Sequence, residues 1–306
     1  MLDQNTDRMW YVIGAVLIGA AIIFGMNTFM PSAFASVGNM FEGTADNATI
    51  IIQSSIYTGN MEDYKPKSVP LSEYVIASDD DFKLMETIDG DKVGLEHFRY
   101  VGSDDYVIIP DVIHDVPVTE YSFMFDEKAS PVKGVASNNT NVESMWNMFS
   151  RSKSRTVDLS HLSTSNVKNM NNMFAYSNIS HVNLDGFDTS NVENFNGMFM
   201  SAPFMALDLS HFDTSKANRL NGVFSHSNLY DLNIVGWVTP KVSVTSGLFE
   251  GTNLKSIDLS TMDFTQMDVY PTLFDNMSNL DIGYARTQAD ADILNEIVAK
   301  DIFVVK

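Results

Sequence analysis

The chain of 306 residues contains no cysteine. This absence excludes disulfide bonds, thiolate metal sites and catalysis by a thiol. Basic residues are also scarce, since 19 Lys and Arg stand against 39 Asp and Glu and the formal net charge is −20 at pH 7. Such a surface repels nucleic acid and anionic lipid headgroups, so we expect no nucleic-acid partner.

Recognisable catalytic motifs are missing as well. The sequence has no Walker loop, no H-E-x-x-H, no G-x-S-x-G and no EF-hand loop. His161 and His211 occupy the same position in two units of the repeat described below, so copying of a template explains their recurrence. We therefore expect no enzyme, no catalytic residue, no cofactor and no metal site.

Charged residues are absent from residues 9–41, and residues 10–30 are almost wholly apolar. At a helical rise of about 1.5 Å per residue, residues 10–30 span about 31 Å, which is enough to cross the hydrocarbon core of a membrane. A buried core helix of this length is unusual. The segment therefore predicts one transmembrane helix.

The flanks of this segment leave two fates open. Arg8 is the only basic side chain near it, which favours the N-terminus inside and the rest of the chain outside. Ala33-Phe34-Ala35 also matches the cleavage site of a secretory signal peptide. We favour an uncleaved anchor, because the apolar stretch exceeds the usual length in a signal peptide. The predicted localisation is the cell membrane, single-pass with an extracellular C-terminal domain, or secretion after cleavage near Ala35.

A phenylalanine recurs every 25 residues through the second half of the chain. This regularity predicts a solenoid, in which one structural unit stacks on the next and buries apolar surface that it cannot bury alone. Each unit opens with an L-x-x-L-x-L pattern typical of leucine-rich repeats, in which a short strand turns alternate residues inward. A second column of bulky apolar residues follows the strands. The recurring phenylalanines are Phe149, Phe174, Phe199, Phe224, Phe249 and Phe274, and the second column comprises Leu162, Phe187, Phe212, Trp237 and Met262.

The second half of each unit has the pattern of a short helix. Thr and Ser residues suit the N-cap, and Val192, Phe195, Met198 and Phe199 then fall on one helical face. A glycine recurs at the position where we expect neighbouring helices to press together or tighten. These glycines are Gly197, Gly222 and Gly247.

Whole phrases of the repeat are similar to those of a known family. VNLDGFDTSNVENFNGMF (residues 182–199) and LDLSHFDTSKANRLNGVF (residues 207–224) resemble the BspA-like bacterial surface leucine-rich repeat family. The resemblance covers about residues 137–282. It implies an exported cell-surface protein, often adhesive, without a shared catalytic site.

The predicted fold class is α/β: a leucine-rich-repeat-like solenoid of 25-residue strand-plus-short-helix units with caps at both ends, preceded by one transmembrane helix. Short strands are expected at 107–110 and 116–119 in the N-terminal cap, and a helix at 287–300 in the C-terminal cap. The predicted organisation is an anchor or signal segment at 1–35, a tether and irregular region at 36–81, an N-terminal cap at 82–136, the repeat solenoid at 137–282 and a C-terminal cap at 283–306.

One column of polar residues is the candidate ligand-binding site. Strand alternation turns these residues outward, where we expect them to line the concave strand face. The column comprises Asp158, Asn183, Asp208, Asn233 and Asp258, with Asp185 beside it. A solvated ladder of side chains bonded along the stack is the alternative. We expect replacement of the three column aspartates with Asn to leave folding intact.

Together these features predict a bacterial cell-surface repeat protein that binds a protein or glycan partner through its solenoid, in the manner of an adhesin. Its contact with the membrane is expected through residues 10–30. The alternative is a non-binding structural spacer or envelope-assembly component anchored by its N-terminal helix. A hydrolase is a third hypothesis, for which the sequence offers no motif.

Overall fold

A computed structural model describes residues 59–85, 97–242, 244–269 and 271–306. These residues belong to one compact unit, Tyr57–Lys306. The predicted transmembrane segment at 10–30 and the cleavage match at Ala35 lie outside the described residues. Within the described ranges, no helix combines the length and the apolar character needed to cross a membrane.

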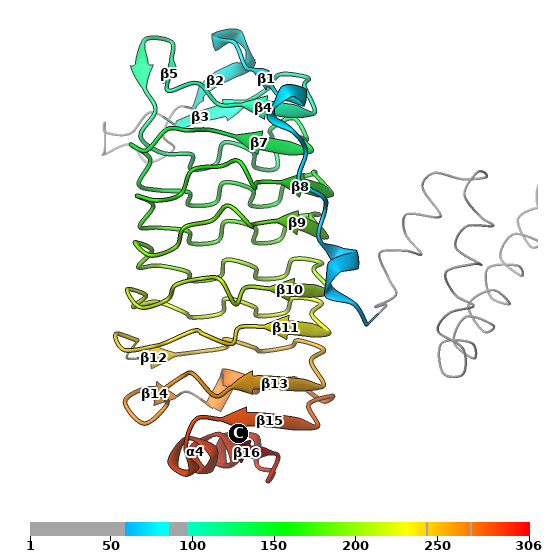
Figure 1. The fold of residues 1–306 in the computed structure, drawn as a ribbon, viewed down its shortest axis with the longest axis vertical. Helices are drawn as coiled ribbons and strands as arrows, with labels where there is room; N and C mark the ends of the chain where they lie inside the picture. Colours follow the sequence, from blue (N-terminus) through cyan, green and yellow to red (C-terminus); the bar gives the residue numbers. More distant parts are fainter. Residues whose placement is uncertain (1–58, 86–96, 243, 270) are drawn as a thin grey trace, which may run out of the picture. The chain divides into compact units, whose positions relative to one another are not determined.

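The repeats form a solenoid of parallel strands stacked one per turn, as predicted (Figure 1). In neighbouring turns, equivalent residues of the 25-residue repeat face each other, as in the pairs Val157 with Val182 and Leu207 with Leu232. The side chains at these central positions are buried, because alternate residues of each strand turn inward. The successive repeat strands are β8 (Thr156–Asp158), β9 (His181–Asn183), β10 (Ala206–Asp208), β11 (Asp231–Asn233) and β13 (Ser256–Leu259).

A second parallel ladder runs through the other half of each turn. It consists of single bridges from Glu120 to Ser144 and onward to Arg219. Strands β12 (Val244–Thr245) and β14 (Asp268–Val269) then continue it. Figure 1 places β12 and β14 across the stack from β11 and β13. Each turn is therefore bonded to its neighbours along both halves.

The short helices predicted for the repeats are wrong. Residues 192–195 are not helical and Asn194 belongs to the second ladder, and turns follow at 196–200. The amides that a helix would use internally instead donate to the next turn of the solenoid, as Phe199 N does to Val223 O at 2.8 Å. Intervening amides close tight turns, as Met173 N does to Met170 O. The apolar spacing correctly identified the buried face, but a sequence of turns presents that face as well as a helix would.

The reason is a residue with left-handed backbone that recurs in the five units from Asn147 to Gly247. The glycine column is not a helix contact: Gly197, Gly222 and Gly247 have φ values of 60°, 60° and 59°. Asn147 and Asn172 occupy the same position with φ values of 56° and 54°. Glycine and asparagine adopt this region at the lowest cost, and it interrupts a right-handed helix.

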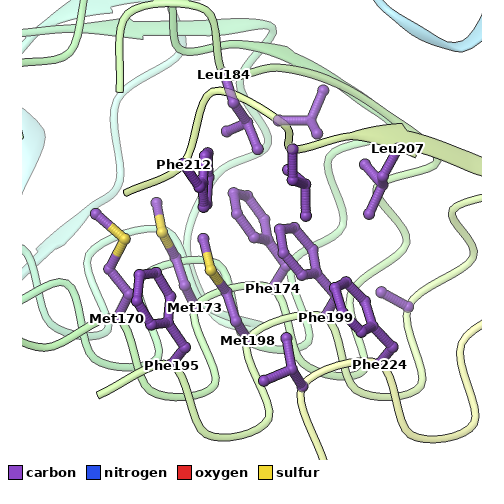
Figure 2. Close-up of a cluster of buried hydrophobic side chains, with 14 of the residues drawn as sticks. Met170, Met173, Phe174, Leu184, Phe195, Met198, Phe199, Leu207, Phe212 and Phe224 are labelled. Atoms are coloured by element: carbon purple, nitrogen blue, oxygen red, sulfur yellow. The ribbon is translucent and has the colours of Figure 1, made fainter. Parts of the chain in front are cut away.

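The recurring phenylalanines form the centre of the core. Ring centroids of successive residues from Phe149 to Phe274 lie 5.5 to 5.9 Å apart with nearly parallel planes. Figure 2 shows the rings of Phe174, Phe199 and Phe224 in file, with methionines of the neighbouring turns beside them. The second apolar column, from Leu162 to Met262, is buried as expected.

Buried threonines join the turns a second time. The hydroxyl of Thr189 accepts a hydrogen bond from Asp213 N at 2.8 Å and donates to Asp213 O at 3.1 Å. Thr164, Thr214 and Thr239 make the same pair of contacts to the following turn. The recurring Asp-Thr-Ser-Asn-Val phrase therefore holds the turns together.

Both ends of the solenoid continue its strand stack. At the N-terminal end, β1 (Val75–Ile76), β4 (Tyr106–Ile108) and β7 (Gly134–Ala136) pair in parallel next to β8. Two antiparallel pairs lie beyond them: β2 (Phe82–Met85) with β3 (His97–Tyr100), and β5 (Val112–Ile113) with β6 (Val116–Pro117). Strands were predicted near β4 and β6, whereas β5 was not predicted.

At the C-terminal end, β15 (Ile282–Ala285) pairs with β13 and with β16 (Phe303–Val305). The predicted helix is confirmed as α4 (Gln288–Val298), whose N-cap Thr287 accepts a hydrogen bond from Asp290 N. Phe264 stands where earlier turns have the buried threonine, and its amide donates to Asp290 Oδ1 at 2.8 Å. Asp290 thereby provides the acceptor for this amide at the end of the stack.

Replacement of Phe199 by Ala is expected to lower the free energy of unfolding by about 3–5 kcal/mol, because it removes a fully buried ring from the middle of the stack. The loss spreads to neighbouring turns, whose stability is shared across their interfaces. Denaturant titration measures it. Tyr176→Ala, at an exposed ring, is the control and costs less than about 1 kcal/mol. Equal costs for the two variants would contradict the central place of the phenylalanine stack.

Thr189→Val keeps the shape of the side chain and removes both of its contacts to the next turn. We expect a loss of about 1–3 kcal/mol, because two backbone groups lose their partner. The adjacent Ser190→Ala is the matched control and changes the free energy of unfolding by less than about 0.5 kcal/mol. Indistinguishable melting curves for the two variants would show that the threonine ladder does not bind the turns.

Candidate functional site

The candidate column stands at the last residue of β8, β9, β10 and β11 and at the penultimate residue of β13. The side chain of every member accepts a hydrogen bond from the amide two residues later, at 2.9 to 3.2 Å. This local turn fixes the direction of each side chain and explains why only Asp and Asn occupy the position. It uses one oxygen, so the second carboxylate oxygen of Asp158, Asp208 and Asp258 is left for other partners.

An N-terminal segment lies across the first part of this column. We call residues 60–74 the strap. It contains two short 3-10 turns, η1 (Met61–Tyr64) and η2 (Leu71–Glu73), joined by an extended stretch with Pro66 and Pro70. Figure 1 shows it running along the stack from β10 past β9 and β8 to β1. These residues were predicted as part of the tether and irregular region, and not on the strand face.

The strap buries Asp158. Val69 N donates to Asp158 Oδ2 at 2.6 Å, and the hydroxyl of Tyr74 donates to the same oxygen at 3.3 Å. His161 contacts Val69 O through Nε2 at 2.8 Å. As a result Asp158 is only 1% exposed. The predicted outward direction holds, but the residue faces the strap instead of solvent.

The second turn of the column is also engaged. Lys65 forms an ion pair with Asp185 at 2.5 Å, and the Tyr64 ring stacks on His181 with centroids 5.7 Å apart. Tyr64 packs further on Met205 and Ala206. Asn183, between these contacts, is 1% exposed. The strap thus supplies a cation, a ring and a backbone donor to the face.

The far end of the column is engaged by the other end of the chain. Lys306 Nζ forms an ion pair with Asp258 Oδ2 and lies 5.8 Å from the centre of the Tyr284 ring. Burial raises the pKa of Asp258, but the hydrogen bonds from Lys306 and Ser260 outweigh it, so the pKa lies below its usual value. Asp258 in the column is therefore paired with a lysine, as Asp185 beside the column is.

The middle of the column is open. Asp208 is exposed and Asn233 half-buried. Asp208 Oδ1 accepts hydrogen bonds from Ser210 N, Ser210 Oγ and Asn233 Nδ2 at 3.0, 2.7 and 3.1 Å. These bonds outweigh the effect of partial burial and lower the pKa of Asp208, so its carboxylate is charged at neutral pH. In the part of the chain that the structure describes, no donor contacts its Oδ2.

The structure thus divides a column that the sequence presented as uniform. Asp158, Asn183 and Asp185 lie under or against the strap, Asp258 contacts the C-terminal lysine, and Asp208 and Asn233 remain accessible. The expectation that all three Asp→Asn changes leave folding intact does not hold at Asp158. The two oxygens of the Asp158 carboxylate accept hydrogen bonds from Val69 N and from Ser160 N. The NH2 group of an asparagine at this position would therefore face one of these two N–H donors.

Parallel strands stacked by a 25-residue repeat place the protein in the class of β-solenoid repeat proteins. The family model described as "Mycoplasma protein of unknown function, DUF285" matches residues 114–183 and 175–285. The chain therefore belongs to this family. No curated protein and no solved structure matches it. The resemblance to BspA-like leucine-rich repeats remains a hypothesis.

Asp158→Asn is expected to loosen the strap. Trypsin should then cleave between Lys67 and Ser68 several times faster than in the native chain, since local opening exposes this bond. Asp208→Asn removes the same charge from a position that the strap does not touch, and should leave the rate unchanged. Equal cleavage rates in both variants would show that Asp158 does not hold the strap.

Acidification is expected to weaken the strap through His181. Burial lowers the pKa of His181, so the strapped state favours the neutral ring. The histidine of an open state has a pKa of about 6.5, so strap stability is full above that value and falls as the pH drops through it toward the lowered pKa. An NMR titration of His181, assigned with His181→Gln, measures this directly. In Tyr64→Ala the pKa should rise toward 6.5, and an unchanged value would rule out burial by the strap as the cause.

Proposed function

We propose that this solenoid is an exported surface protein of a bacterium, which binds a protein or glycan partner through its strand face in the manner of an adhesin. The observation that carries the proposal is the division of the polar column. Two stretches of the strand face already engage non-repeating parts of the chain, namely the strap and the lysine after β16, whereas the stretch between them presents charged and polar groups to solvent. A face that recognises two segments of its own chain has the chemistry to recognise a third.

Two further features support this proposal. The predicted export segment at residues 10–30 directs the solenoid outside the cell. The repeat array also gives a long regular surface, which solenoid proteins commonly use to bind partners. The Asp-Thr-Ser-Asn-Val phrase shared by the repeats has a structural role, because its residues make the threonine contacts and the local turns.

A spacer is the second candidate function. The contacts of the strap and of Lys306 are intramolecular, and a solenoid that only separates two parts of the cell envelope requires nothing more. Exchange of residues 59–306 for an unrelated repeat array of similar length distinguishes the two functions. Loss of partner capture by cells that carry the exchanged chain supports binding, and full retention of the cellular function supports the spacer.

The proposed topology places the repeats outside the cell. Protease added to intact cells should therefore degrade the solenoid within the time that it degrades a known surface protein, while a cytoplasmic marker stays whole. The full chain, detected through an epitope at its C-terminus, is the substrate. A solenoid that is protected until the cells are lysed would contradict both the topology and the surface function.

Partner capture tests binding itself. Intact cells that display the full chain are mixed with labelled surface proteins and with a glycan array, and cells that lack the chain are the control. Specific retention of one partner is the expected result. Absence of retention across both sets would overturn the binding function in favour of the spacer.

A further inference from the structure

The open stretch of the strand face continues an interface that the chain itself makes. The first element of the strap, η1, packs on Met205 and Ala206 at the start of β10. Asp208, at the end of the same strand, is accessible. We call Asp208, Ser210, Asn233 and Val235 the open rungs.

The two occupied stretches show which chemistry this face accepts. At Asp185 and at Asp258 the contact is the ammonium group of a lysine. At Asp158 it is a backbone amide of an extended segment flanked by Pro66 and Pro70. Both occupants carry a lysine: the strap lies extended on the face, and Lys306 follows β16, the last strand of the stack. The strap contains Lys65 and Lys67 within the sequence Tyr-Lys-Pro-Lys-Ser-Val-Pro.

The open rungs repeat the acceptors of the occupied ones. The local hydrogen bonds of Asp208 all end on Oδ1, as those of Asp158 and Asp258 do, which leaves Oδ2, the atom that meets Val69 N in the first turn and Lys306 Nζ near the last. Next to it, Asn233 adds an amide, and Val235 adds an apolar surface that is 39% exposed. A net charge of −20 favours a cationic occupant over an anionic one.

We propose that the open rungs bind an extended, lysine-bearing segment of a partner protein, which lies on the face as the strap does and places a lysine on Asp208. This inference rests on the proposed binding function and names the partner chemistry and the position. Extended segments with proline lose little conformational entropy on binding, because their backbone is already restricted. The exposed ion pair contributes modestly to affinity and is screened by salt.

The experiment uses the full chain, purified in detergent, and a peptide with the strap sequence Tyr-Lys-Pro-Lys-Ser-Val-Pro that carries a fluorophore. A second peptide with both lysines replaced by glutamine is the control for charge. Fluorescence anisotropy should show that the lysine peptide binds more tightly, and that salt weakens its binding. Equal binding of both peptides would overturn the inference, and so would binding of neither.

Two variants of the same turn locate the contact. Asp208→Asn should weaken binding of the lysine peptide by about three- to fivefold, the range of an exposed ion pair. Asp213→Asn is the matched control, because Asp213 is also exposed, also accepts a hydrogen bond from the amide two residues later, and carries the same charge. It should change binding by less than about 1.5-fold. Equal effects would show general attraction to an acidic surface and overturn the proposed site.

The absence of cysteine allows the position to be mapped. The lysine peptide should slow alkylation of the thiol introduced by Val235→Cys and leave that of Ser190→Cys unaffected. Faster trypsin cleavage between Lys67 and Ser68 on addition of the peptide would mean that it displaces the strap, which overturns binding at the open rungs.

Failure of this inference is distinguishable from failure of the proposed function. If displayed native chain and Asp208→Asn capture the same surface partner equally well, the inference is overturned and the binding function stands. If the peptide binds at Asp208 but no surface partner is captured, the chemistry of the open rungs is supported and the adhesin-like function is not.

Discussion

Hydrogen bonds between successive turns are the interaction on which the rest of the structure depends. Each turn is too short to bury its own apolar face, so it exists only when bonded to its neighbours. The bonds fix a register in which residues 25 apart lie side by side, as Val157 and Val182 do. That register brings the phenylalanine rings into a stack and sets the threonine hydroxyls between turns. It also aligns the aspartates and asparagines that end the strands.

Much of this architecture could be predicted from the sequence, because periodicity records register directly. The interval between Phe174 and Phe199 predicted both the solenoid and the buried column. The helix in each unit could not be excluded in the same way, since Val192, Phe195 and Met198 are inward in a series of turns as well as in a helix. The signal that distinguishes them is the column of Gly and Asn residues, whose left-handed backbone is incompatible with a continuous helix.

The candidate site shows what periodicity cannot reveal. Asp158, Asp208 and Asp258 are equivalent within the repeat, yet their environments differ because segments from outside the repeat approach two of them. Val69 and Lys306 belong to non-repeating parts of the chain, and no interval in the sequence connects them to the column. Long-range contacts of this kind depend on the path of the chain ends. Tyr64, Lys65 and Tyr74 were the available indications, as aromatic and cationic residues in a segment otherwise interpreted as a tether.

The distinction between occupied and open rungs therefore depends on the strap being an ordered part of the strand face. Amide hydrogen exchange of the full chain tests this directly, because Val69 N donates a hydrogen bond to Asp158 within the interface. Among the described residues, Lys67 N makes no such hydrogen bond and is the reference amide within the strap. The account predicts that the amide of Val69 exchanges at least tenfold more slowly than an unstructured amide and approaches the protection of the neighbouring strands. Exchange of Val69 at the unprotected rate would mean that the strap does not occupy the face, and the distinction between occupied and open rungs would then fail.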